Sequence, residues 1–275
     1  MKVFVAGATG AIGRQLVPRL VAAGHEVVGM TRSDAKQAML VDMGAVPVVA
    51  DALDGAQVAE AVARARPDVI VHELTAIGGV NLRRFDQDFA LTNRLRTEGT
   101  DHLLSAGQAV GVRRFVAQSV GAYAAYARTG GPIKSEEDPV DGTPPRQMRA
   151  TMAAIRHLED AVIGAEWTEG VVLRYGVFYG PGTSLVPGGD QFELVRKRKF
   201  PLVGDGAGVW SFMPMPLRRR SPRSSWGGVV CTTWSTIIPH RSPNGCQRSR
   251  GNWARRSRCA CPASSGDCSR GRRVS

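Results

Sequence analysis

Residues 7–13 read Gly7-Ala8-Thr9-Gly10-Ala11-Ile12-Gly13, and this stretch decides the fold. A short apolar run over residues 2–6 comes before it and predicts a β-strand. After it, apolar side chains recur at the spacing of one helix face over residues 12–21, and Gly24 is a typical helix stop. The glycines are therefore predicted to lie on a strand-to-helix turn.

Each glycine of this turn has its own physical use. Gly7 would allow the tight turn, Gly10 would admit a phosphate against the backbone, and Gly13 would let the helix pack closely on the strand. A diphosphate would then meet the N–H groups and the positive end of the helix. We therefore expect a dinucleotide cofactor here. The residues expected to bind it are Gly7, Thr9, Gly10, Ala11, Ile12 and Gly13.

Charge and cysteine divide the chain into a body and a tail. The chain has 275 residues and a formal net charge of +12. Residues 217–275 hold 13 arginines and one acid, Asp267, so this segment carries the whole net charge. All five cysteines also lie beyond residue 230. A body without cysteine is typical of a cytosolic enzyme that has no disulfides.

The spacing Gly-x-x-Gly-x-x-Gly resembles the short-chain dehydrogenase/reductase superfamily, and Gly7-Ala8-Thr9-Gly10 resembles its extended, epimerase/dehydratase-like branch. The segment from Leu173-Arg174 to Tyr179-Gly180-Pro181-Gly182 resembles the same branch, and the resemblance spans residues 1–212. It implies that the loop at Tyr179-Gly180-Pro181-Gly182 carries the nicotinamide end of the cofactor and opens the substrate lobe.

The choice between NADP and NAD depends on the end of the second predicted strand. In NAD-preferring sites an acid at this point holds the ribose hydroxyls, whereas here no acid is present and Arg32 follows the strand. A guanidinium suits a 2′-phosphate, so the sequence favours NADP, with NAD as the alternative. The family resemblance adds Asp51 and Leu53 as cofactor residues, because its Asp-x-x-Asp turn meets the adenine.

The proton-transfer residues of the family are missing. Reductases and epimerases of this superfamily use a Tyr-x-x-x-Lys pair, followed four residues later by Glu. Aligning that Glu on Glu159 places Ile155 and Thr151 at the Lys and Tyr positions, and no Tyr-x-x-x-Lys occurs in the chain. The resemblance implies an active-site Ser or Thr just past the fifth strand, and Ser119, the last residue of that predicted strand, is the hydroxyl close to this point. Tyr123 is a second candidate catalytic residue, as a replacement for the missing tyrosine.

Two further tyrosines, Tyr126 and Tyr175, could donate the proton in their place. Without such a donor, the chain would carry out different chemistry or no catalysis at all.

The composition of the tail differs from that of the body and is not that of a folded core. Arg, Ser, Pro, Gly, Cys and Trp dominate it, with little periodicity. Back-translated with GC-rich codons and read one base earlier, residues 231–246 permit Val-Tyr-Asn-Val-Val-Asp-Asp, which is the segment that the family would have here. We infer a frameshift near residue 213.

The sequence thus predicts an α/β fold with a doubly wound, Rossmann-type parallel sheet over residues 1–180. The start of a truncated substrate lobe is expected over 181–212, and a disordered tail over 213–275.

The expected function is that of a cytoplasmic NAD(P)-dependent oxidoreductase or epimerase acting by hydride transfer on a small carbonyl, alcohol or sugar-type substrate. A non-catalytic dinucleotide-binding protein is the alternative, and nucleic-acid binding through the tail is a weaker one. No apolar run reaches membrane-span length and no metal site is expected, while a homodimer is left open.

Overall fold

The structure is a computed structural model. It describes residues 1–77, 84–120, 143–179, 183, 186–199, 210–212 and 236–238. Candidate Tyr123, its alternative Tyr126 and most of the tail lie outside these residues.

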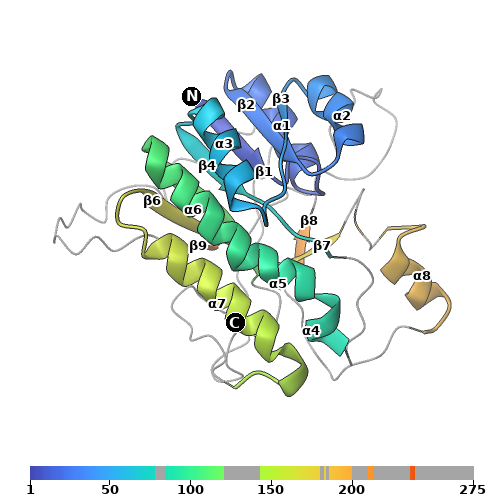
Figure 1. The fold of residues 1–275 in the computed structure, drawn as a ribbon. Helices are drawn as coiled ribbons and strands as arrows, with labels where there is room; N and C mark the ends of the chain where they lie inside the picture. Colours follow the sequence, from blue (N-terminus) through green and yellow to red (C-terminus); the bar gives the residue numbers. More distant parts are fainter. Residues whose placement is uncertain are drawn as a thin grey trace, which may run out of the picture. The chain divides into compact units, whose positions relative to one another are not determined.

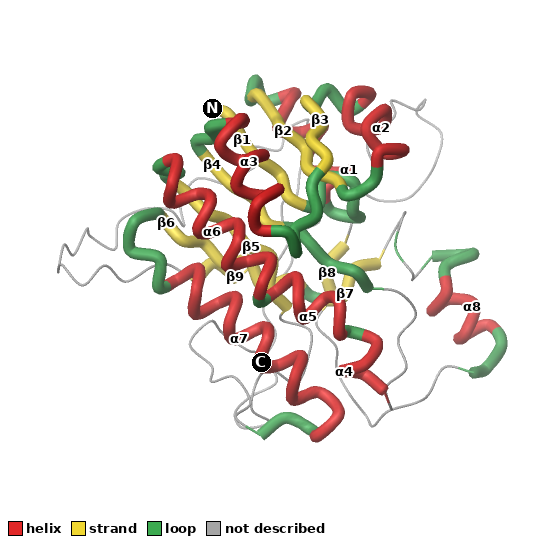
Figure 2. The backbone as a smooth tube through the Cα atoms, viewed as in Figure 1, coloured by secondary structure: helices red, strands yellow, loops and turns green. Residues whose placement is uncertain are grey.

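A seven-stranded sheet forms the centre, in the order β3-β2-β1-β4-β5-β6-β9. Its strands are β1 (Lys2–Ala6), β2 (Glu26–Thr31), β3 (Val46–Val49), β4 (Val69–His72), β5 (Arg114–Val120), β6 (Glu169–Tyr175) and β9 (Thr236–Ile238). The first six are parallel, and β9 pairs antiparallel with β6. The strand order reverses between β1 and β4, which confirms the predicted doubly wound sheet (Figure 2).

Helices cover both faces of this sheet. The α-helices of the described residues are α1 (Gly13–Ala22), α2 (Gln37–Asp42), α3 (Gly55–Ala65), α4 (Phe85–Asp88), α5 (Ala90–Arg96), α6 (Glu98–Val110), α7 (Arg149–Ile163) and α8 (Asp190–Arg196), of which α8 buries no residue. One core cluster joins α3, α6 and α7 to the sheet through Val58, Leu103 and Leu158. A second joins α1 and α2 to the opposite face through Val17 and Leu40. Figure 1 shows α3, α6 and α7 side by side over one face.

The sequence over residues about 86–110 predicts one long helix from its apolar spacing. This prediction is wrong in one respect, because the structure divides the segment into α4, α5 and α6. The break between α5 and α6 falls at Thr97, whose φ and ψ are −95° and −84°. Its hydroxyl donates to the carbonyl oxygen of Asn93 at 3.1 Å. A threonine that bonds back in this way bends a helix. Local hydroxyl chemistry therefore overrides the continuous apolar pattern here.

A second, two-stranded sheet pairs β7 (Val177–Tyr179) in parallel with β8 (Trp210–Phe212). The tail over 213–275 is expected to be disordered, but its residues Thr236–Ile238 form the strand β9, in which Ile238 pairs with Val172 of β6. The other residues of the tail lie outside the described residues. None of the described helices is long and apolar enough to span a bilayer.

Candidate active site

The glycine turn lies at the carboxyl end of β1, beside the point where the strand order reverses. Gly7 has a φ of +91°, and a Cβ atom on it would lie 2.7 Å from the carbonyl oxygen of Glu73. A Cβ on Gly13 would lie 2.4 Å from the carbonyl oxygens of Gly7 and Ala8. Both positions therefore exclude any side chain. The turn is held by β1 below it and by the backbone that follows β4.

Gly10 differs from its neighbours because its surroundings are open. A Cβ there would meet only the carbonyl oxygen of Gly7, at 3.1 Å, and Gly10 and Ala11 are exposed. In the described part of the chain, the N–H groups of Ala11, Ile12 and Gly13 have no hydrogen-bond acceptor. The first turn of α1 carries no acidic side chain. These residues fit a diphosphate, which would accept from the N–H groups and lie against the positive end of α1.

The ends of β2 and β3 add polar groups to the same edge of the sheet. Arg32 directly follows β2 and is exposed, and it forms no ion pair with any residue that the structure describes. Asp51 is exposed and its Oδ1 accepts from the N–H of Leu53 at 3.0 Å, so its second carboxyl oxygen can accept from a ligand. Asp54 caps α3 by accepting from the N–H of Ala56 at 3.0 Å, as expected of a cap.

His72 ends β4 and is 1% exposed. Its Nε2 bonds with the hydroxyl of Thr100 at 3.0 Å, and its Nδ1 accepts from the N–H of Leu74 at 3.2 Å. Burial lowers the pKa of His72 to about 4, so the ring stays neutral at physiological pH. His72 is therefore a structural residue with both ring nitrogens in use.

Glu73 follows His72, on the opposite face of the sheet. The sequence places residues 73–76 close to the cofactor but does not single out Glu73 as a catalytic candidate. It is 5% exposed, and among the described residues its Oε2 has no hydrogen-bond partner. Burial raises the pKa of Glu73 to about 8, while a hydrogen bond from the Tyr175 hydroxyl lowers it in part. Burial, together with Glu73, raises the pKa of Tyr175. The signal in the sequence was an acid placed directly after an apolar strand.

Ser119, a predicted catalytic residue, is buried inside a polar network. Its hydroxyl donates to Oε1 of Glu159 at 2.5 Å. Arg174 holds the same carboxylate from β6, with its Nε 2.9 Å from Oε1 and its Nη2 2.5 Å from Oε2. The side chains of Arg174 and Glu159 are only 10% and 11% exposed. The network ties α7 to β5 and β6.

The positions that correspond to the missing tyrosine and lysine are occupied by groups with other partners. Thr151 is fully buried, and its hydroxyl donates to Oδ1 of Asp86 at 2.7 Å and accepts from Nδ2 of Asn93 at 3.1 Å. Ile155, one turn later, is 4% exposed and packs with Met152. Neither side chain can transfer a proton to a substrate from these positions.

A match between the chain and a protein-family model shows which family the chain belongs to. The model of the NAD dependent epimerase/dehydratase family matches residues 3–213. The chain belongs to this family. It is thus a member of the extended short-chain dehydrogenase/reductase superfamily, its function is of the NAD(P)-dependent oxidoreductase or epimerase type, and its cofactor is an NAD-type dinucleotide.

Three known proteins illustrate how this family member compares with others. A 3-diazoavenalumate denitrifying reductase from a Streptomyces species is 48% identical over 78% of the chain and 68% of the relative. A 4-hydroxy-2-methyl-3-oxo-4-farnesyl-3,4-dihydroquinoline-1-oxide ketoreductase from Stigmatella aurantiaca is 27% identical over 75% of the chain and 58% of the relative. The fold resembles that of UDP-glucose 4-epimerase from Thermus thermophilus in complex with NAD, with a TM-score of 0.59, 24% identity, and coverage of 77% and 70% of the two chains.

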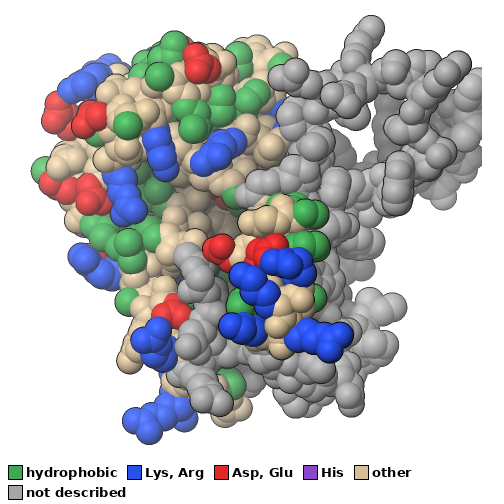
Figure 3. Space-filling model, turned by 90° about the vertical axis from the view of Figure 1, so that its right-hand side faces the viewer, with side chains coloured by type: hydrophobic (Ala, Val, Ile, Leu, Met, Phe, Trp, Pro, Cys, Tyr) green, Lys and Arg blue, Asp and Glu red, His purple; other side chains and the backbone are tan. Residues whose placement is uncertain are grey.

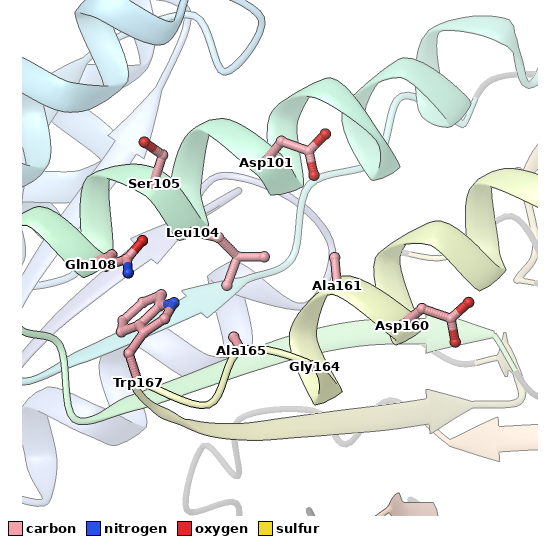
Figure 4. Close-up of a pocket in the computed structure, with 9 residues that line it drawn as sticks. All are labelled: Asp101, Leu104, Ser105, Gln108, Asp160, Ala161, Gly164, Ala165 and Trp167. Atoms are coloured by element: carbon pink, nitrogen blue, oxygen red, sulfur yellow. The ribbon is translucent and has the colours of Figure 1, made fainter.

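Two other surface features of this family member lie apart from the glycine turn. A cavity of about 440 Å³ lies between α6 and α7, with Asp101 and Asp160 at one end and Gln108 and Trp167 at the other (Figure 4). Trp167 lies two residues before the first residue of β6, so this cavity is at the edge opposite the glycine turn.

The end of α8 carries consecutive basic residues, which are exposed, and Figure 3 shows Lys and Arg side chains gathered on the face that it draws. These residues are Arg196, Lys197, Arg198 and Lys199. Glu193 pairs with the first two, so its single negative charge offsets one of these four positive charges.

Proposed function

We propose that the chain is an NADPH-dependent reductase of a small electron-poor substrate and that it does not act as an epimerase. The observation that carries this proposal is the state of α7, where Thr151 and Ile155 replace the proton-transfer pair and are both buried. An epimerase must first oxidise an alcohol, and this oxidation needs a base that accepts the hydroxyl proton. A reductase needs no such base.

The residues proposed to hold the cofactor follow the carboxyl edge of the sheet from β1 to β3. The glycine turn and the start of α1 would bind the diphosphate, and Asp51 would accept from the adenine amino group beside Leu53. The exposed guanidinium of Arg32 would pair with a 2′-phosphate, which supports NADP over NAD. When bound, the reduced cofactor supplies a hydride to the substrate.

The proposed substrate class is a diazo-substituted carboxylate, and an activated ketone is the second class. Support for the first comes from the reductase that is 48% identical and named for such a compound, since the identity extends over 78% of this chain. Both classes have an electron-poor centre that can accept hydride without an alcohol first being deprotonated. The missing base is therefore no obstacle to either reaction.

A substrate panel with NADPH tests the proposal. Oxidation of NADPH would be followed by absorbance in the presence of a diazo carboxylate, a 3-oxoalkanoate or a UDP-sugar. We expect NADPH consumption with the diazo compound, accompanied by release of dinitrogen, or with the ketone. Interconversion of UDP-sugars without net NADPH consumption would overturn the proposal, as would the absence of reduction in every case.

A further inference from the structure

Glu73 is a buried acid, and no Lys or Arg among the residues that the structure describes forms an ion pair with it. It is 5% exposed, its Oε2 has no hydrogen-bond partner in the described ranges, and the group that bonds its carboxyl is the neutral hydroxyl of Tyr175. Buried carboxylates are normally paired with a positive charge or fully hydrogen-bonded. Burial of the Glu73 carboxyl group in this setting does not stabilise the fold, so it indicates another role for this residue.

The pair lies where the reactive half of a dinucleotide is expected. The N–H of Glu73 donates to the carbonyl oxygen of Ala6 at 2.8 Å, and a Cβ on Gly7 would lie 2.7 Å from the carbonyl oxygen of Glu73. Tyr175 is the last residue of β6 and is in register with Val120, the last residue of β5. A dinucleotide lies across the carboxyl edge of such a sheet, with one mononucleotide over each half. Glu73 and Tyr175 thus flank the end of β5, in the half opposite Arg32.

We propose that Glu73 is the proton donor of the reduction, and that Tyr175 positions its carboxyl group. This assignment rests on the proposed reductase function and gives the chain a replacement for the missing Tyr-x-x-x-Lys pair. We assign the transferred proton to Oε2, because this buried oxygen of the Glu73 carboxyl group has no hydrogen-bond partner among the described residues.

The step balances as follows for a ketone. The carbonyl carbon gains the hydride supplied by reduced nicotinamide, the C=O π bond breaks, and the oxygen takes the proton from Glu73. Glu73 is left as a carboxylate and regains a proton from water after the product leaves. A diazo carbon gains a hydride from reduced nicotinamide and a proton from Glu73, while its C–N bond breaks and dinitrogen leaves.

Burial favours the acid form of Glu73 at neutral pH. Among the described residues, Tyr175 is the titratable group that interacts with it. The adjacent titratable side chains point to the other face of the sheet, where His72 bonds Thr100 and Arg174 bonds Glu159. Because burial raises the pKa of Glu73 to about 8, the group is protonated at pH 7 and its pKa lies near the working pH of a general acid.

Infrared spectroscopy of the full chain tests the protonation state without substrate or cofactor. We expect a carboxylic-acid carbonyl band at pH 7 that is lost in Glu73→Gln and kept in the control Glu166→Gln, whose side chain is exposed. A missing band in the parent protein would overturn the assignment, whether or not a substrate has been found. Circular dichroism and NADPH binding by calorimetry would show that each variant is folded and binds cofactor.

Kinetics test the proton transfer itself. With the acceptor that the parent protein reduces, Glu73→Gln should lower kcat by about 100-fold or more, since a general acid contributes on this scale. Tyr175→Phe should move the alkaline limb of the kcat–pH profile upwards, because it removes the hydrogen bond that lowers the pKa of Glu73. An unchanged kcat in Glu73→Gln would refute the role of Glu73 and leave the reductase function standing. A parent protein that reduces nothing would refute both.

Discussion

The buried ion pair between Arg174 and Glu159 offers a sharp test of what holds the active-site end of the sheet together. Arg174→Met keeps an unbranched side chain of similar length and removes the guanidinium. The change deletes the contacts at 2.9 and 2.5 Å to the two carboxyl oxygens. It leaves Glu159, with 11% of its side chain exposed, bonded only to the hydroxyl of Ser119 among the residues that the structure describes.

The expected cost follows from this burial. Breaking a buried ion pair by removing one partner destabilises a protein by about 3–5 kcal/mol, because an uncompensated charge stays behind. The matched control is Arg114→Met, which breaks a pair with Glu169 across the same two strands, β5 and β6. Those side chains are 49% and 57% exposed, so the control should cost no more than about 1 kcal/mol.

Urea unfolding followed by circular dichroism measures both variants. With a urea dependence of about 3 kcal/mol/M, Arg174→Met should lower the unfolding midpoint by about 1–2 M and the control by less than about 0.4 M. Replacing Glu159 by Met as well should recover most of the loss, since the unpaired charge is then gone. The reasoning fails if Arg174→Met behaves like the control, or if the double variant is less stable than either single one.

Four shorter predictions concern the cofactor, the pH dependence and the tail. Gly10→Val should abolish NADPH binding in calorimetry while the circular dichroism spectrum is kept, because the turn is open at this point; unchanged affinity would place the cofactor elsewhere. Arg32→Ala should narrow the difference between the NADPH and NADH dissociation constants, and equal constants in the parent protein would contradict the NADP preference. Because burial raises the pKa of Glu73 from 4.5 to about 8, the folded chain keeps a proton that the unfolded chain loses. The free energy of unfolding should therefore fall as pH rises between these values, and Glu73→Gln should flatten that fall in urea titrations at several pH values. Sequencing the encoding DNA should reveal a Tyr-Asn-Val strand when the tail is read one base earlier, and a frame that stops early would refute the frameshift.

The elements that follow local patterns were predictable from the sequence. The glycine turn, the cap at Asp54 and the six parallel strands depend on residues that are close together in the chain, so spacing alone indicates them. The same holds for the position of Arg32, which directly follows a strand. The break at Thr97 was missed because apolar periodicity carries no information on a hydroxyl that bonds back to the helix.

The contacts at the candidate site join residues that are far apart in the chain, so local sequence patterns could not predict them. Asp86 accepts from the N–H of Thr151, 65 positions later, and this pairing decides that Thr151 has no role at the substrate. Glu73 and Tyr175 meet only because β4 and β6 end at the same edge of the sheet. No periodicity encodes contacts of this kind, since they depend on strand order and on which face each side chain takes.

The two outer edges of the sheet also differ in how they resist self-association. At one edge, β3 is only four residues long and carries Pro47, which has no N–H to offer to a foreign strand. At the other edge, the seven-residue β6 is covered over Val172–Arg174 by β9, a strand supplied by the tail. Shortening the chain before residue 236 would therefore uncover a row of backbone donors and acceptors on β6. We therefore expect the loss of β9, a three-residue strand within the most basic segment of the chain, to promote self-association through β6.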